Sequence, residues 1–181
     1  MNLKYSNIVY NDTANGQGMR ISFFVQGCPH HCKGCFNQES WDFNGGIEFT
    51  QDVLDEIMYV FGSFKEGYDG ITFLGGEPLE LPNQKGVLEL LKRVREECPD
   101  RNVWLYTGYT YESDLLNKES RIYSETLPEI LKYVDILVDG KWIASLYDEN
   151  IQYRGSTNQR VIDLRKTEVS GSVVIWDKLE R

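Results

Sequence analysis

Three closely spaced cysteines constrain what this chain can fold into more than any other feature. Cys28, Cys32 and Cys35 follow the pattern Cys-x3-Cys-x2-Cys. Thiolates gathered in one short loop repel one another and oxidise readily, so a metal centre is the simplest reason to place them together. Positions i, i+4 and i+7 also share one face of a helix, but Pro29 and Gly34 are poor helix residues and argue against that alternative.

Two kinds of metal centre fit three cysteines. A closed zinc site needs four ligands, and His30 or His31 would complete it, so a zinc-tied binding module is the alternative from another functional class. A 4Fe-4S cluster instead takes one thiolate for each iron. Three cysteines then hold three irons and leave the fourth iron open to another molecule. We expect the cluster, with both histidines as solvent-exposed loop residues.

The apolar runs predict an α/β fold with a row of parallel strands. A nearly continuous apolar strand, 19–26, precedes the cysteine loop 27–37. Further strands and helices alternate after this loop at the spacing of βαβ units. The expected strands are 71–74, 103–106 and 134–138, and the expected helices are 50–61, 84–97 and 127–133. Five or six such units cannot close as an eight-stranded barrel does, so the prediction is a partial, open (βα)5–6 barrel.

The two ends of the chain have weaker patterns. Residues 3–10 read as an extended lead-in, whereas 160–164 and 172–176 resemble strands. The length of 181 residues fits one domain, 1–181, whose tail 150–181 has the least regular pattern.

Small and polar residues stand where the later strands end. Two glycines, Gly75 and Gly76, let a backbone approach a ligand closely, and Glu77 offers a carboxylate to an ammonium group. Thr107 and Asp139 follow the next two strands, where ribose or carboxylate contacts are expected, although Asp139 fits a turn equally well. Because the carboxyl ends of parallel strands meet at one edge, we expect these residues to share a site with the cysteine loop.

Charge and hydropathy narrow the function classes. The formal net charge is −9, with 19 basic and 28 acidic residues, which argues against nucleic acid as a partner. No apolar stretch approaches the length of a membrane span, and the first residues lack the apolar centre of a signal peptide. Three clustered cysteines are more typical of a metal or catalytic site in a reducing compartment than of a disulfide framework, so we expect a cytoplasmic protein. Cys98, at a predicted helix end, is expected to be a free structural thiol.

The cysteine spacing resembles that of the radical S-adenosylmethionine (SAM) superfamily. Flanking stretches are similar to the glycyl-radical activating enzymes, and among these to the activators of anaerobic ribonucleoside-triphosphate reductase. The stretches that carry this resemblance are 16–20, 23–24, 27–28, 37–41 and 154–160. The chain departs from the family at 15–18, where Asp-Gly-Pro-Gly is usual, and Gly34 stands where many superfamily members have an aromatic residue.

The same resemblance implies roles for individual residues. It implies that the cluster ligands are Cys28, Cys32 and Cys35. The SAM amino group would be bound by Gly75, Gly76 and Glu77, and the adenosyl side would be lined by Gly34, Cys35 and Phe36. The segment 154–160 would lie near the mouth of the barrel and touch SAM or a partner protein.

The activity implied is that of an oxidoreductase. It would cleave SAM reductively at a 4Fe-4S cluster and generate a glycyl radical on the anaerobic reductase. Because the sequence has no second cysteine cluster, an external donor such as reduced flavodoxin would supply the electron. A pyruvate formate-lyase-type activator or another small radical SAM enzyme is the alternative within the same chemistry.

Overall fold

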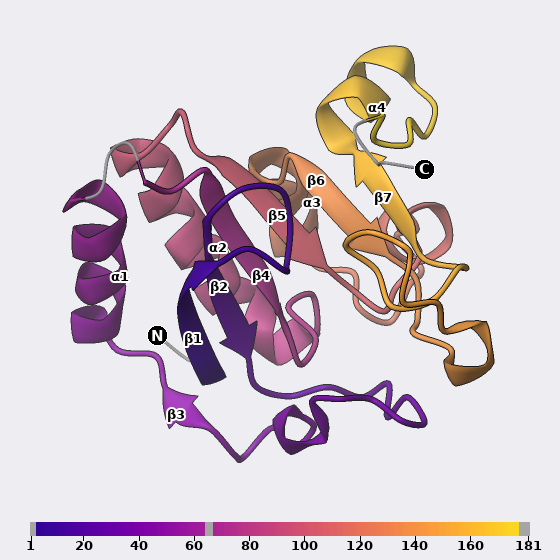
Figure 1. Cartoon of the computed structure of the whole chain (residues 1–181), viewed down its shortest axis with the longest axis horizontal. Helices are drawn as coiled ribbons and strands as arrows, with labels where there is room; N and C mark the ends of the chain where they lie inside the picture. Colours follow the sequence, from indigo (N-terminus) through magenta and orange to yellow (C-terminus); the bar gives the residue numbers. More distant parts are fainter. Residues whose placement is uncertain (1–2, 64–66, 178–181) are drawn as a thin grey trace.

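A single twisted sheet organises the computed structural model, which describes residues 3–63 and 67–177 (Figure 1). The seven strands of this part of the chain lie in the order β3-β1-β2-β4-β5-β6-β7. Their bounds are β1 Lys4–Asp12, β2 Arg20–Val25, β3 Ile47–Glu48, β4 Gly70–Gly75, β5 Asn102–Tyr106, β6 Ile136–Asp139 and β7 Arg160–Asp163. The prediction of one domain, 1–181, also covers residues 1–2, 64–66 and 178–181, which lie outside the described residues.

The four central strands confirm the predicted parallel α/β sheet. Strands β2, β4, β5 and β6 run parallel and neighbour one another in chain order. Each matches its predicted range to within two residues. The number of parallel strands is smaller than the five or six units expected, because β1, β3 and β7 are antiparallel to their neighbours. The loop between β1 and β2 is too short for the crossover that a parallel pair requires.

The helices of the described residues connect the parallel strands and follow β7. They are α1 Gln51–Ser63, α2 Leu81–Glu97, α3 Thr126–Tyr133 and α4 Leu164–Ser170, with single turns at Gln38–Ser40, Tyr111–Leu115 and Ala144–Leu146. The predicted cap of α1 is present, since the Thr50 hydroxyl accepts a hydrogen bond from the Val53 N–H at 3.4 Å. Right-handed crossovers between strands in chain order place successive helices on one face of the sheet, and Figure 1 shows α2 and α3 behind the strands.

The two faces of the sheet bury different residues because side chains alternate along each strand. Phe23, Phe73 and Leu105 point toward the helices and join the main apolar core. Trp104 and Val138 lie on the other face, in a smaller cluster with Ile136, Val161 and Trp176. This second face is therefore free of the crossover helices, and its carboxyl-terminal edge can hold a cavity.

The tail contains one of the two predicted strands. The range 160–164 forms β7. No strand is assigned to 172–176, but this stretch lies antiparallel to β7 through the bridge between Ile162 and Ile175 and two flanking hydrogen bonds, from the Asp163 N–H to Val174 O and from the Trp176 N–H to Val161 O, both at 2.9 Å, so the second strand prediction is confirmed only in part. Helix α4 starts between them, because the Asp163 carboxylate accepts a hydrogen bond from the Lys166 N–H at 2.9 Å and caps its first turn.

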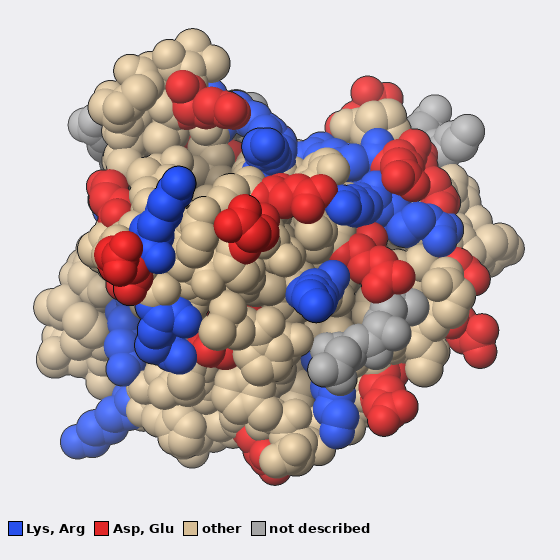
Figure 2. Space-filling view, turned by 180° about the vertical axis from the view of Figure 1, so that it is seen from behind, with Lys and Arg blue, Asp and Glu red and all other residues tan. Residues whose placement is uncertain are grey.

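The surface carries charges of both signs. Figure 2 shows Lys and Arg side chains interspersed with Asp and Glu on the face opposite to that of Figure 1. Among the residues that the structure describes, no helix is both long enough and apolar enough to cross a membrane.

Candidate functional site

The cysteine loop leaves the carboxyl end of β2 along an irregular path of bends and turns, and Cys28, Cys32 and Cys35 lie in no helix, so the alternative of a helical cysteine face is wrong. Backbone hydrogen bonds fix its base: the Gly27 N–H donates to Ser40 O at 2.7 Å and the Cys28 N–H donates to Trp41 O at 3.1 Å. A tight turn closes its tip, where the Cys35 N–H donates to Cys32 O at 3.0 Å. The three cysteines are thus held together without a helix.

Backbone N–H groups support the three sulfur atoms. Cys35 Sγ accepts a hydrogen bond from the Asn37 N–H at 3.4 Å. Burial raises the pKa of Cys28 to about 12, and the backbone N–H of His30 acts against this shift. Burial also raises the pKa of Cys32, while the charge of Lys141 and the Trp142 backbone N–H act in the opposite direction. Deprotonating these thiols therefore costs free energy unless a positively charged centre lies beside them.

This donor set fits an iron–sulfur cluster. All three cysteines are free thiols, and all three line one cavity. Cysteine thiolates with N–H groups directed at sulfur are the usual surroundings of such clusters. Within 3–63 and 67–177, no group of three or more His, Cys, Asp and Glu side chains is placed to hold a single metal ion.

The turn after β4 faces the cysteine loop at very short range. The Gly76 N–H donates to Val25 O and the Glu77 N–H donates to Gly27 O, both at 2.8 Å. A Cβ atom on Gly76 would lie 2.5 Å from the Gly27 carbonyl oxygen, so only glycine allows this approach. The sequence pattern thus predicted correctly that the turn and the cysteine loop meet.

The Glu77 carboxylate is buried, and four donors surround it. Its Oε1 accepts from the Leu79 N–H at 3.0 Å and from the Thr107 hydroxyl at 2.8 Å. Its Oε2 accepts from the Gly108 N–H at 2.8 Å and pairs with His30 Nε2 at 2.9 Å. The carboxylate therefore ties the ends of β4 and β5 to the cysteine loop.

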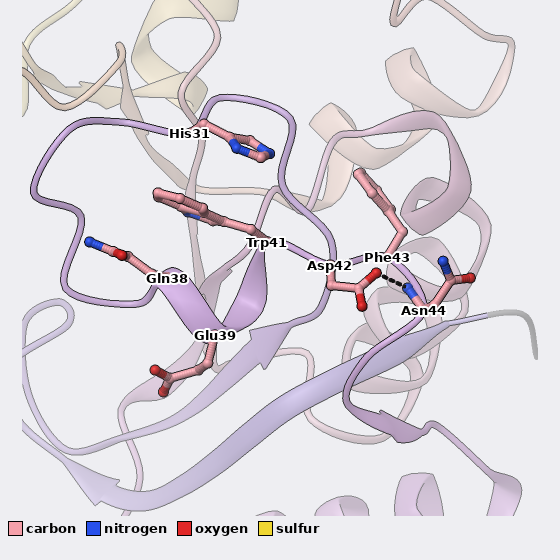
Figure 3. Close-up of a pocket in the computed structure, with 7 residues that line it drawn as sticks. All are labelled: His31, Gln38, Glu39, Trp41, Asp42, Phe43 and Asn44. Carbon is pink, nitrogen blue, oxygen red and sulfur yellow. Dashed lines mark hydrogen bonds between the residues drawn. The ribbon is translucent and has the colours of Figure 1, made fainter.

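The two histidines differ, and the prediction that both are solvent-exposed is wrong for His30. The His30 side chain is 13% exposed and lies edge-on to the Tyr109 ring, with ring centroids 4.6 Å apart. His31 is exposed and stacks on Trp41, as Figure 3 shows. Glu77 lies 47 residues further along the chain, so no local pattern indicated its contact with His30.

A cavity of about 720 Å³ lies between the cysteine loop, the ends of β4 and β5, and the segment 140–159. Nearly all predicted site residues line it. They are Cys28, Cys32, Gly34, Cys35, Phe36, Gly75, Gly76, Glu77 and Thr107. Asp139 is not among them, although the adjacent Gly140 is. The carboxyl ends of the parallel strands thus meet at one site, as expected.

Comparison with known proteins gives the family. The family model described as "4Fe-4S single cluster domain" matches residues 14–162. The anaerobic ribonucleoside-triphosphate reductase-activating protein of Vibrio cholerae is 38% identical over 148 residues, which is 82% of this chain and 90% of that protein. The proteins of the same name from Haemophilus influenzae and Escherichia coli K12 are 38% and 37% identical, over 87% and 85% of this chain and 96% and 94% of theirs.

The chain belongs to the family of anaerobic ribonucleoside-triphosphate reductase-activating proteins. The resemblance found in its sequence is thereby confirmed. Among solved structures, QueE from Escherichia coli is similar with a TM-score of 0.38 and 17% identity, over 60% of this chain and 53% of that one.

Several cavity residues were not among the predicted site residues, and most of them come from the segment 140–159, whereas Ala14, Asn15 and His30 come from earlier in the chain. Trp142 packs against the cysteine loop, since a Cβ atom on Gly34 would lie 3.2 Å from its indole ring. Tyr106 and Arg154 also line the cavity. Within the described residues, the buried Tyr106 hydroxyl and Arg154 Nε have no hydrogen-bond partner. Of these three residues, only Arg154 lies in the stretch 154–160, which the resemblance implied to touch SAM or a partner protein.

A shallow depression lies beside the cysteine loop. Figure 3 shows the residues that line it, which are His31, Gln38, Glu39, Trp41, Asp42, Phe43 and Asn44. The Asn44 N–H donates to the Asp42 carboxylate at 2.8 Å. None of Cys28, Cys32 and Cys35 lines this depression, so the larger cavity is the candidate site.

Proposed function

We propose that this chain activates an anaerobic ribonucleoside-triphosphate reductase by radical SAM chemistry. One observation supports this most directly: the three cysteines and the Gly75–Glu77 turn line the same cavity. Cys28, Cys32 and Cys35 would hold a 4Fe-4S cluster whose fourth iron stays free for SAM. The names of the family members support the reductase as the partner.

The cofactor supplies the electron-transfer chemistry. Cys28, Cys32 and Cys35 would hold a cluster that supplies one electron for the reductive cleavage of SAM, which would yield methionine and a 5′-deoxyadenosyl radical able to take a hydrogen atom from a glycine α-carbon of the reductase. The protein provides binding, orientation and exclusion of water. The electron itself would come from an outside donor such as reduced flavodoxin.

The turn 75–77 would bind the amino group of SAM. Its glycines let the backbone lie close to the ligand, and the buried charge of Glu77 favours a cation nearby. Because four protein donors already occupy the Glu77 carboxylate, we assign it to fixing the turn and providing negative charge. Thr107 belongs to the same arrangement through its hydrogen bond to Glu77.

The adenosyl half of SAM would lie toward the cysteine loop tip and the segment 140–159. Gly34, Cys35 and Phe36 line this part, and the Phe36 side chain is 85% exposed. Trp142 supplies an aromatic surface beside Gly34. The unpartnered donors of Tyr106 and Arg154 suit the acceptor atoms of a ribose or a purine. The open sheet would act as the partial barrel that admits the glycine loop of the reductase in the cytoplasm.

Anaerobic reconstitution tests this function against its rivals. With iron and sulfide, the chain should take up about four irons per molecule and show a broad visible absorption that bleaches with dithionite. Added SAM should be cleaved, and adding the reductase should give a glycyl radical signal by electron paramagnetic resonance. A colourless protein with one zinc would support the binding module, and activation of a pyruvate formate-lyase instead of the reductase would support the other activator.

A further inference from the structure

His30 connects the two halves of the site. It lies between Cys28 and Cys32 in the cysteine loop, and its Nε2 is 2.9 Å from Oε2 of Glu77. The Glu77 side chain is only 1% exposed, so the pair is shielded from solvent. Since an ionised Glu77 only accepts hydrogen bonds, this contact assigns the ring proton to Nε2.

The ring of His30 has little room to move. It packs edge-on against Tyr109. It also lies against Gly108, where an added Cβ atom would be 2.5 Å from the ring. The Gly108 N–H donates to the same Glu77 oxygen as His30. Gly108 and Tyr109, directly after β5, therefore confine the imidazole and direct it at the carboxylate, while His30 itself lines the cavity.

The backbone of His30 acts on the cluster side. Its N–H group donates a hydrogen bond to the Cys28 sulfur. One residue thus faces a predicted cluster ligand through its main chain and the Gly75–Glu77 turn through its side chain. A ligand that spans the open iron and the turn would have its two ends placed by His30.

We propose that His30 is a positioning residue that sets the distance between the cysteine loop and the Gly75–Glu77 turn for SAM. This inference rests on the proposed function. The base of the loop has other anchors, such as the Gly27 N–H bond to Ser40 O and the Glu77 N–H bond to Gly27 O. Loss of the imidazole should therefore leave the fold and the cluster intact and change how well SAM fits.

The chain offers a matched control in the next residue. His31 is exposed, stacks on Trp41 and lines the depression of Figure 3 instead of the cavity. We would compare His30→Ala, His30→Gln and His31→Ala. Glutamine keeps an N–H donor on a side chain of similar reach, so it should restore the bond to Glu77.

Three measurements on reconstituted protein test the proposal. Iron content should match the wild type in every variant, and the melting temperature should fall by about 5 °C in His30→Ala alone, because a buried hydrogen bond to a charged group is lost. The KM for SAM should rise about tenfold in His30→Ala, as expected for loss of one hydrogen bond to a charged group, with a smaller change in kcat. His30→Gln should recover most of this loss, and His31→Ala should stay within about twofold of the wild type. The change that SAM causes in the cluster's electron paramagnetic resonance spectrum should weaken only in His30→Ala.

A fourth measurement needs neither cluster nor SAM. In the metal-free protein, amide hydrogen exchange over 28–37 should be faster in His30→Ala than in wild type, His30→Gln or His31→Ala. Unchanged exchange and unchanged KM in His30→Ala would overturn the proposal, as would equal effects of His31→Ala. If the wild type fails to cleave SAM, the proposed function fails, while the exchange data still decide whether His30 holds the loop to the turn.

Discussion

Arg160 holds the carboxylate of Asp139: its Nε donates to Oδ1 at 2.9 Å and its Nη2 donates to Oδ2. The Tyr111 N–H donates to the same carboxylate at 2.9 Å. Asp139 is 1% exposed and does not line the cavity. The residue that sequence reasoning assigned to ribose or carboxylate binding thus joins β6, β7 and the turn at 111–115, and its role toward a ligand stays a prediction.

Asp139→Asn should therefore affect stability more than SAM binding. The change removes the buried negative charge that pairs with Arg160, although Arg160 still pairs with Glu112. We expect a loss of about 2 kcal/mol in the free energy of unfolding. The KM for SAM should change less than about threefold. Urea unfolding of the metal-free protein and SAM cleavage kinetics give the two values. A large rise in KM at unchanged stability would instead assign Asp139 to the ligand.

Cys32→Ala and Cys98→Ala should separate the proposed cluster thiols from the fourth cysteine. Removal of Cys32 leaves two thiols in the loop, too few to hold a cube with one open iron, so SAM cleavage should be abolished. Cys98 lies at the end of α2, outside the cavity, and its replacement should leave iron content and cleavage at wild-type levels. Iron analysis after anaerobic reconstitution, followed by detection of 5′-deoxyadenosine, measures both. Full activity of Cys32→Ala would rule out the three-cysteine site.

The parallel strands were predictable because each is an apolar run that ends at a glycine or polar residue. The motif residues at their ends followed from the same reading, since parallel strands place their carboxyl ends together. What failed was the count of parallel units. An extended segment such as 3–10 has the same local pattern whether it pairs parallel or antiparallel, and only the length of the connection to β2 decides.

Contacts between distant segments could not be read from the sequence. His30 is adjacent to cysteines, but its partner Glu77 comes from another strand end. Trp142 was unassigned because it lies in an irregular segment, yet it packs on Gly34. The positions of such residues depend on the tertiary contacts of irregular loops. These contacts leave no periodic pattern in the sequence.

Asp12 should make the stability of the metal-free protein depend on pH. Burial alone would raise its pKa, but hydrogen bonds from Ser22, Asn15 and Ala14 outweigh burial and lower the pKa below 3.8. A carboxyl group whose pKa is lower in the folded than in the unfolded chain stabilises the fold at pH values above its unfolded-state pKa. This contribution is lost as the pH falls through the folded-state pKa. Asp12→Asn should therefore cost about 1–2 kcal/mol at pH 7.

The comparison across pH tests the sign of this effect. Urea unfolding of wild type and Asp12→Asn should differ most at neutral pH, and the two free energies should converge as the pH falls below 3.8. A gap that stays constant down to acid pH would show that the charge of Asp12 is not what stabilises the loop beside the cavity.

Gly34→Ala should disturb the cavity through Trp142 as well as through the backbone. Gly34 has φ +80°, and its added Cβ atom would lie 3.2 Å from the indole. Gly171 has φ +70°, and no atom of the described residues lies near its added Cβ position, so Gly171→Ala reports the backbone strain alone. We expect Gly34→Ala to be more destabilising than Gly171→Ala. Trp142→Leu should relieve part of the destabilisation that Gly34→Ala causes, with a coupling energy of at least about 0.5 kcal/mol in a double-mutant cycle. Urea unfolding of the four proteins of the cycle, with Gly171→Ala as reference, measures this coupling. Strictly additive effects would contradict a direct contact between Trp142 and the tip of the cysteine loop.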